Sequence, residues 1–273
     1  MTQANQNSHN NPLNPREIKG INVVGLKTLI GKEVGRFINV YTQTVVAPVV
    51  TTLLFYAVFA LAFGGITRTI GDISYLAFLA PGLIMMTMVQ NAFANTSSSM
   101  VIAKVQGNIV DILMPPLSSG ELFWGFIIGG VARGLCVGTV VAVVVFFTVG
   151  TQIHSVFHIV SFAILGTMML SSIGLAAGIW SQKFDHIAAV TNFLVTPLTF
   201  LSGTFYSISQ LPGIWRELAL YNPFFYMIDG FRYGFIGHAD GNVTIGLFFL
   251  LGINIGLGFM TWMMLKTGYK IKT

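Results

Sequence analysis

The stretch that decides the fold is FWGFIIGGVARGLCVGTVVAVVVFFTV, which covers residues 123–149. Its only charged side chain is Arg133. A helix needs about 20 consecutive apolar residues to cross a lipid bilayer, and this stretch is longer than that. Its apolar residues follow one another without the alternation that is typical of a membrane β-strand. The stretch therefore predicts a transmembrane helix that tilts in the bilayer or extends beyond it.

Five further stretches of the same kind lie on either side of this one. They cover residues 45–63, 76–95, 156–180, 188–211 and 243–265. Pro48, Pro81 and Pro197 lie inside these stretches and predict local kinks, because proline has no N–H to donate within a helix. The sequence thus predicts an all-α polytopic membrane protein, with six transmembrane helices in a single domain of residues 17–273.

The composition agrees with a membrane protein and excludes several other classes. Of the 273 residues, 54% are hydrophobic and 8% are charged, whereas a soluble domain carries about 25% charged residues. A soluble enzyme, a disordered protein and a nucleic-acid-binding protein are therefore excluded, despite the net charge of +5. The 30 glycines suit helices that pack closely in a membrane. The single cysteine, Cys136, lies in an apolar stretch, so no disulfide framework is expected.

The positions of Lys and Arg predict how the chain is oriented. If the N-terminus lies inside the cell, three basic residues fall in outer loops, namely Arg68, Arg216 and Arg232. Ten fall on the inner side: Arg16, Lys19, Lys27, Lys32, Arg36, Lys104, Lys183, Lys266, Lys270 and Lys272. Basic loops of membrane proteins stay on the cytoplasmic side. Both termini are therefore predicted to be cytoplasmic.

The N-terminal region predicts a tail followed by an amphipathic helix. Residues 1–16 are mostly polar and predict a disordered cytoplasmic tail. Residues 17–41 place apolar side chains at steps of three or four, so that they share one helical face: Leu26, Ile30, Val34, Phe37 and Tyr41. Such a helix is expected to lie along the inner membrane surface, with its basic residues toward anionic headgroups. It serves either as a plain anchor or in a mechanical role.

The longest inner loop, between Thr96 and Leu122, predicts a short helix over Asn108–Met114 that Pro115 and Pro116 end. The apolar residues Ile109, Ile112 and Leu113 would form a small face on this helix. An apolar face on the cytoplasmic side needs a cover, either the membrane or a partner protein. The alternative is a connector that packs beneath the protein's own helices.

The outer segment from Ser202 to Asn242 is rich in aromatic residues and is interrupted by proline and glycine. Two short helices are expected, one beginning near Pro212 and one after Asn222 and Pro223. Neither is long enough to cross a bilayer, so they should lie at the outer interface or enter the membrane part way. This segment is either an outer gate or an interfacial aromatic belt. The candidate gate residues are Trp215, Tyr221, Phe224, Tyr226, Phe231 and Tyr233.

Arg133 is the only charged side chain inside a predicted span, ten residues from its start and therefore near mid-depth at about 1.5 Å per residue. A charge at that depth is costly unless it faces protein or water. It indicates a polar groove, a hydrogen bond to backbone carbonyls, or a tilted helix whose arginine reaches the interface. The predicted spans hold no Asp or Glu, which argues against an ion-coupled carrier.

No motif for chemistry within the chain is convincing. The segment GLKTLIGKE, Gly25 to Glu33, has the wrong glycine spacing for a phosphate loop and carries Glu33 where Ser or Thr should bind magnesium. The chain is therefore not expected to hydrolyse ATP or to hold a cofactor. His154 and His158 are four residues apart, but no third ligand lies near them in the sequence, so no metal site is expected.

Three stretches carry a resemblance to the permease subunits of ABC-2 type exporters. They are LAPGLIMM (residues 79–86), GGVARGLCVG (residues 129–138) and, most distinctively, NPFFYMIDGFRYGFIG (residues 222–237). The resemblance runs from about Leu26 to the C-terminus. It implies a multi-pass protein of the bacterial inner membrane, in which two copies of the permease form the pathway.

The resemblance also implies two copies of a separate ATP-binding subunit, which would hold ATP and magnesium. ATP-driven closure of those subunits would be transmitted to the permease through the Thr96–Leu122 loop. The residues implied to couple the two subunits are Asn108, Ile109, Asp111, Ile112 and Leu113.

Three other classes of function remain open alternatives. An ion-coupled secondary transporter or a channel would work without an ATPase. A membrane enzyme acting on lipids would need a cluster of catalytic or metal-binding side chains at an interface. A non-transporting scaffold would need neither an ATPase nor a cluster of catalytic side chains. The sequence leaves the transported substrate open between a lipid, a drug and a glycan.

Overall fold

The computed structural model describes residues 20–63, 69–70, 73–149 and 153–271, and the predicted tail of residues 1–16 lies outside them. Besides loops and turns, the described chain consists of helices and a small antiparallel hairpin of β1 (Thr69–Ile70) and β2 (Ile73–Ser74). The helices are α1 (Val23–Ile38), η1 (Thr42–Val46), α2 (Ala47–Phe63), α3 (Tyr75–Val105), α4 (Ile109–Leu113), α5 (Ser119–Val149), α6 (Val156–Trp180), α7 (Phe184–Val190), η2 (Thr191–Val195), α8 (Thr196–Phe200), η3 (Ile208–Gln210), α9 (Ile214–Leu220), α10 (Pro223–Ile236) and α11 (Val243–Thr267).

Five helices in the described residues are long and apolar enough to cross a membrane. They cover Thr42–Ala62, Tyr75–Val105, Ser119–Phe147, Val156–Trp180 and Val243–Thr267. Each overlaps a predicted span, and α6 has the predicted bounds of residues 156–180. The helix α3 continues ten residues beyond its predicted end because its polar residues there are buried among other helices instead of facing water.

The span predicted at residues 188–211 is wrong in its bounds. A helical rod of α7, η2 and α8 begins at Phe184 and ends at Phe200. The chain then turns through Gly203, whose φ of 75° is in the left-handed region that favours glycine. Ile208–Gln210 forms only a 3-10 turn. The prediction carried the span past this turn although residues 202–210, SGTFYSISQ, are largely polar.

Two of the three predicted proline kinks coincide with π-helical turns. The turn η1 ends two residues before Pro48, and η2 ends two residues before Pro197. Proline lacks the N–H that the carbonyl four residues earlier would accept, so the wider hydrogen bonding of a π-turn replaces the α-helical pattern. Pro81 lies inside α3, whose α-helix continues past it.

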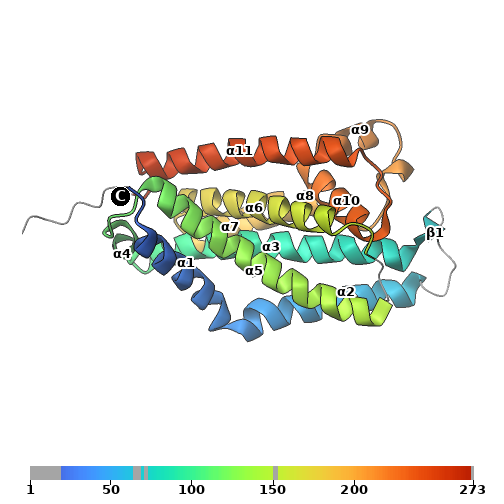
Figure 1. Cartoon of the computed structure of the whole chain (residues 1–273), viewed down its shortest axis with the longest axis horizontal. Coiled ribbons are helices and arrows are strands. Elements are labelled where there is room, and N and C mark those ends of the chain that lie inside the picture. The colour runs from blue at the N-terminus through green and yellow to red at the C-terminus, as the bar shows by residue number, and fades with distance from the viewer. Residues whose placement is uncertain (1–19, 64–68, 71–72, 150–152, 272–273) are drawn as a thin grey trace, which may run out of the picture.

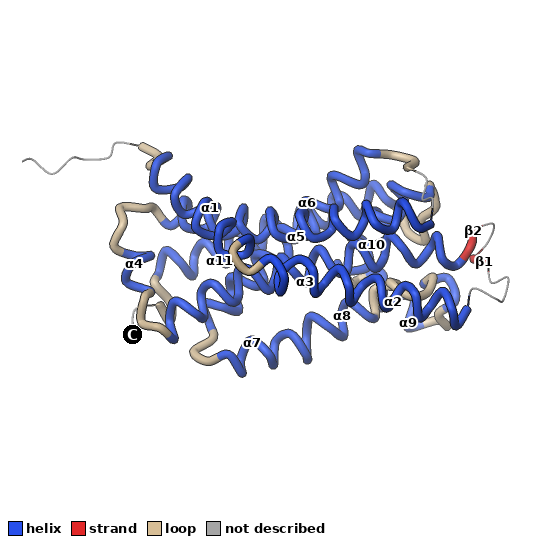
Figure 2. The backbone as a smooth tube through the Cα atoms, turned by 90° about the horizontal axis from the view of Figure 1, so that it is seen from below, coloured by secondary structure: helices blue, strands red, loops and turns tan. Residues whose placement is uncertain are grey.

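The helices form a long bundle, with α3 and α6 at its centre (Figure 1). The helix α5 crosses the bundle obliquely, and α1, α4 and the C-terminal end of the chain lie at one end. We call this the α4 end; α9, α10 and the hairpin lie at the opposite end. Figure 2 shows the α7–η2–α8 rod along the outside of the bundle.

Small residues bring the central helices close together. A side chain at Gly174 of α6 would collide with the Phe93 carbonyl oxygen and the Thr96 side chain of α3. Thr96 Oγ1 donates to the Ser171 carbonyl oxygen of α6 at 2.9 Å. Such small and hydroxylated residues are typical of helices that pack within a membrane.

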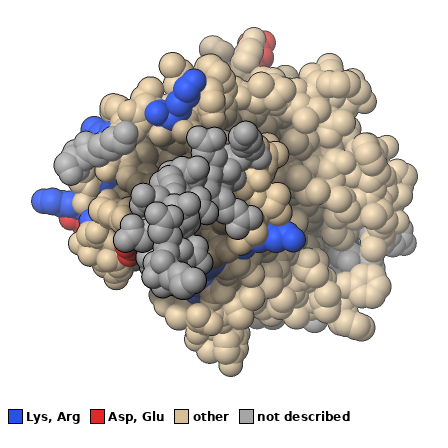
Figure 3. Space-filling view, turned by 60° about the vertical axis from the view of Figure 1, so that its left-hand side comes forward, with Lys and Arg blue, Asp and Glu red and all other residues tan. Residues whose placement is uncertain are grey.

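The outer surface of the bundle suits a lipid environment. Large apolar side chains are exposed along α2 and α11, for example Leu54, Leu61, Phe248 and Ile255. The Lys and Arg side chains in view in Figure 3 lie around the α4 end, and most of the remaining surface in view is uncharged. On the face in view, the charged side chains thus lie at the end of the bundle that is expected to meet water.

Candidate functional site

The helix α1 packs against α5 through a face that differs from the predicted one. Its buried residues are Leu29, Glu33 and Phe37. Tyr41, assigned to the apolar face from the sequence, is 59% exposed. A side chain at Gly125 of α5 would meet Leu29, and one at Gly129 would meet Glu33. The helix is therefore docked on protein along a face that contains a carboxylate.

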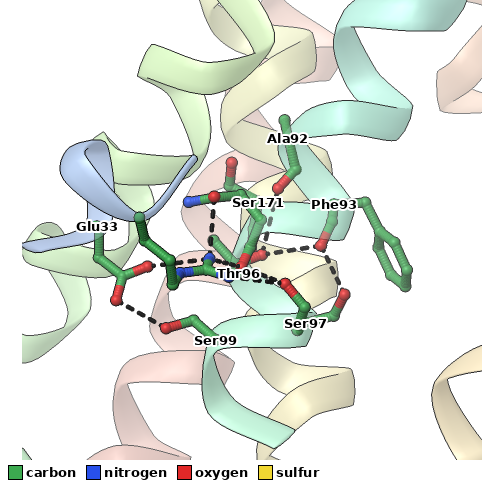
Figure 4. Close-up of polar contacts among 10 residues, drawn as sticks. Glu33, Ala92, Phe93, Thr96, Ser97, Ser99 and Ser171 are labelled. Atoms are coloured by element: carbon green, nitrogen blue, oxygen red, sulfur yellow. Dashed lines mark hydrogen bonds and ion pairs between the residues drawn. The ribbon is translucent and has the colours of Figure 1, made fainter. Parts of the chain in front are cut away.

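The Glu33 carboxylate binds a polar cluster on α3. Ser99 Oγ donates to Glu33 Oε1 at 2.7 Å, and Arg36 Nη2 lies 3.3 Å from Glu33 Oε2. Figure 4 shows Glu33 turned from α1 toward Ser99. Arg36 also donates to the Asn95 carbonyl oxygen at 2.6 Å and to Ser98 Oγ at 3.1 Å. These bonds offset the cost of burying Glu33, whose side chain is fully buried.

We expect Gly129→Ala to destabilise the protein by about 1–3 kcal/mol, because an added Cβ overpacks the interface between α1 and α5. That Cβ would lie 2.5 Å from Glu33 Cβ and 3.2 Å from its Cγ. The measurement is the thermal unfolding midpoint of the purified protein in detergent. Gly256→Ala in α11 is the matched control, because nothing lies within 4 Å of its added Cβ. Equal midpoints for the two variants would contradict the close docking of α1.

Arg133 reaches from α5 to α3, where its Nη2 donates to Asn91 Oδ1 at 3.1 Å. The partner is thus a side-chain amide, and not the backbone carbonyls that were one of the alternatives. The side chain is half-buried, and its Nε is a buried donor without a hydrogen-bond partner. Arg133 forms no ion pair with a described acidic residue.

The short helix predicted over Asn108–Met114 is present as α4, with Asn108 at its N-cap and Met114 at its C-cap. Its predicted apolar face is wrong in part. Ile112 is only 5% exposed and belongs to the core cluster of the α4 end, and Ile109 is half-buried against it. The exposed residues of this segment are Asn108, Val110, Asp111, Leu113 and Met114. A partner would therefore meet Val110, Leu113 and Met114 rather than Ile112.

The six candidate gate residues do not form one cluster in this chain. Trp215 and Tyr221 are exposed on and after α9, whereas Phe224 and Phe231 are buried in the core. The remaining two, Tyr226 and Tyr233, are half-buried. The Tyr226 ring lies 5.1 Å from that of Phe249 in α11.

The two histidines singled out in the sequence contact an aromatic ring instead of forming a metal cluster. The ring of Tyr233 lies 5.3 Å from that of His154 and 5.0 Å from that of His158. His158 Nδ1 also lies 2.8 Å from Ser155 Oγ. No group of three or more His, Cys, Asp or Glu residues suited to a metal is found in the described part of the chain.

Arg232, assigned to an outer loop from the sequence, is instead buried inside α10. Its Nη2 donates to the Gly203 carbonyl oxygen at 2.7 Å, and its Nε donates to the Phe78 carbonyl oxygen at 3.2 Å. Its guanidinium lies over the Phe78 ring and 3.8 Å from Asp229. Asp229 in turn accepts from the backbone N–H groups of Asp240 and Gly241. This pair joins α10 to α3 and to both neighbouring loops.

The Glu33 cluster was missed because an acidic residue in an amphipathic helix is normally assigned to the water-facing side. Two features of the sequence point to it. Glu33 follows Leu29 and precedes Phe37 at steps of four, so the three residues share a face. The pair Gly125 and Gly129 provides a matching surface at the same spacing in another helix.

The long apolar helices, with arginines held between them, define a polytopic helical membrane protein. The sequence model described as ABC-2 type transporter matches residues 24–236, and the chain belongs to that family. The inner membrane transport permease YadH of Escherichia coli strain K12 is 37% identical over 250 residues, which are 92% of this chain and 98% of that protein. Nodulation protein J of Rhizobium leguminosarum bv. viciae is 22% identical over 184 residues, 67% of this chain and 71% of that protein.

Proposed function

We propose that this chain is the permease subunit of an ATP-driven exporter in the bacterial inner membrane, working as a homodimer with a separate ATP-binding subunit. Membership of the ABC-2 family and the likeness to a named transport permease support this function. In this proposal ATP and magnesium belong to the partner. The transported substrate is a lipid, a drug or a glycan.

The observation that carries the proposal is the exposed apolar surface of α4. Val110, Leu113 and Met114 are 52%, 38% and 77% exposed at the end of the bundle where basic residues gather. Apolar side chains in such a place favour a protein partner that covers them. We infer that this end is cytoplasmic, as the distribution of Lys and Arg predicts, and that the ATP-binding subunit docks there.

We further propose that the α7–η2–α8 rod is a sixth membrane crossing. At about 1.5 Å per residue the rod is about 25 Å long, close to the thickness of the hydrocarbon core. Phe193 and Leu194 in its middle are exposed, as expected for contact with lipid or with a second copy of the chain. Together with the five long helices, the rod would leave both termini on the cytoplasmic side.

The test is co-expression with a candidate ABC ATP-binding subunit from the same genome, followed by purification in mild detergent. We expect a complex of two permeases and two ATP-binding subunits, with an ATPase rate that differs from that of the free subunit. Mass measurement in solution and an ATPase assay report the two properties. A folded permease that purifies alone and transports without an ATPase would contradict the proposal and support an ion-coupled carrier or channel.

A further inference from the structure

Two arginines from different helices meet on one face of α3. Arg36 of α1 binds Asn95, whose Oδ1 accepts at 3.0 Å, and Arg133 of α5 binds Asn91. Asn91 and Asn95 are four residues apart and therefore lie one above the other on the helix. The two arginines therefore bind α3 about one helical turn apart. We call Arg36, Arg133, Asn91 and Asn95 the arginine groove.

The arginine groove carries an excess positive charge. Glu33 is the only acidic residue bound to it in the described chain, and its ion pair is with Arg36. The partner of Arg133 is a neutral amide. A half-buried guanidinium without a counter-ion is expensive in a membrane protein, so its presence indicates that a negative charge is supplied from elsewhere.

Several donors of the groove lack an acceptor. Arg36 Nε, Arg133 Nε and Asn95 Nδ2 are buried side-chain nitrogens without a hydrogen-bond partner. Buried donors of this kind are normally satisfied, because each one left unpaired costs about 1–3 kcal/mol. A group with several oxygens is the natural complement to planar guanidinium donors, and phosphate fits that geometry.

Two α3 side chains that bind the arginines also face a hollow at the protein surface, although neither arginine lines that hollow. Asn91 and Ser98, which bind Arg133 and Arg36 respectively, also line a cavity of about 370 Å³ between α3 and the rod. Gln90 and Thr191 add further polar groups to its wall. The cavity has room for a phosphate headgroup, and the exposed apolar surface of the rod lies beside it for an attached chain.

We propose that the arginine groove binds a phosphate-bearing anion, either the headgroup of a phospholipid or the phosphate of a transported lipid-linked molecule. The role of this binding in transport rests on the proposed function, whereas the binding itself does not. Binding is a property of the permease alone, and it can be measured without the ATP-binding subunit. Failure of binding and failure of ATP coupling are therefore separate results.

The test uses native mass spectrometry of the detergent-purified permease with dioctanoyl phosphatidic acid as the probe. We expect it to bind at least tenfold more tightly than dioctanoyl phosphatidylcholine, whose headgroup has no net charge. We expect Arg133→Gln to weaken binding of phosphatidic acid at least tenfold. Lys32→Gln is the matched control, because it removes one positive charge from the exposed side of α1. It should bind like the unaltered protein.

A second variant keeps the proposal testable if Arg133→Gln does not fold. Asn91→Asp places a carboxylate where Arg133 already donates, so it preserves the contact and neutralises the arginine. We expect this variant to have an unchanged unfolding temperature. We expect its affinity for phosphatidic acid to be at least tenfold lower than that of the unaltered protein. Either folded variant binding phosphatidic acid as well as the unaltered protein, or equal binding of the two lipids, would overturn the proposal.

Inorganic pyrophosphate distinguishes the two sources of the anion. If pyrophosphate displaces phosphatidic acid in an Arg133-dependent way, the phosphate group alone is recognised, and a phosphorylated cargo fits the site. If phosphatidic acid binds in an Arg133-dependent way and pyrophosphate does not compete, the acyl chains are needed, and a membrane phospholipid is the ligand. Both results support the phosphate site.

Discussion

Arg232→Leu is expected to lower sharply the yield of properly folded protein. The guanidinium is 1% exposed and is bound to two backbone carbonyls, to the Phe78 ring and to Asp229. Its removal leaves the Asp229 carboxylate buried beside no cation. Breaking a buried pair in this way costs about 3–5 kcal/mol, which is a large part of the typical net stability of about 5–15 kcal/mol.

The measurement for Arg232→Leu is the yield of monodisperse protein in gel filtration after detergent extraction, together with the thermal unfolding midpoint of what remains. Arg216→Leu is the matched control, since Arg216 is exposed on α9. It should behave like the unaltered protein. Equal yields and midpoints for the two variants would show that the buried arginine contributes nothing to folding.

The double variant Val110→Asp and Met114→Asp is expected to fold normally and to lose coupling to the ATP-binding subunit. Both side chains are more than half exposed on α4 and its C-cap, so the bundle does not need them. Two carboxylates placed in an apolar contact must be desolvated when a partner docks, and that weakens docking. We expect the permease-dependent change in ATPase rate to fall at least tenfold.

Two controls separate loss of coupling from loss of folding. Gln182→Asp adds a charge to an exposed loop between α6 and α7 and should leave the ATPase response unchanged. Ile112→Asp places a carboxylate in the core cluster of the α4 end and should lower the unfolding midpoint. A double variant that stays folded and still couples fully would exclude α4 as the docking helix.

The sequence predicted those parts of the fold that hydropathy and proline determine. The bounds of α6, the short helix before Pro115 and the disturbances at Pro48 and Pro197 follow from local chemistry. The end of the rod at Phe200 depends on a turn at Gly203 that tertiary packing stabilises. The Ser202-Gly203-Thr204 sequence is the local signal for this turn, and the prediction did not use it.

The polar sites were harder to predict because they depend on pairs that are distant in sequence. Arg133 was found because it is a lone charge in an apolar stretch. The exposed position expected for Arg232 was wrong because the carbonyls it binds belong to Phe78 and Gly203, which no local pattern connects to it. Glu33 was missed because it was assigned to the water-facing side of its helix, whereas its donor Ser99 lies on α3.

The two π-turns affect the rotation of the helical segments that follow them. Each π-turn accommodates about one residue more than a turn of α-helix. One extra residue rotates the segment that follows by about 100° and shifts it by about 1.5 Å along the helix axis. The segments beyond them are α2 and α8. One extra residue in each of two outer helices therefore helps to set which stripe of α2 and of α8 faces outward from the central helices α3 and α6.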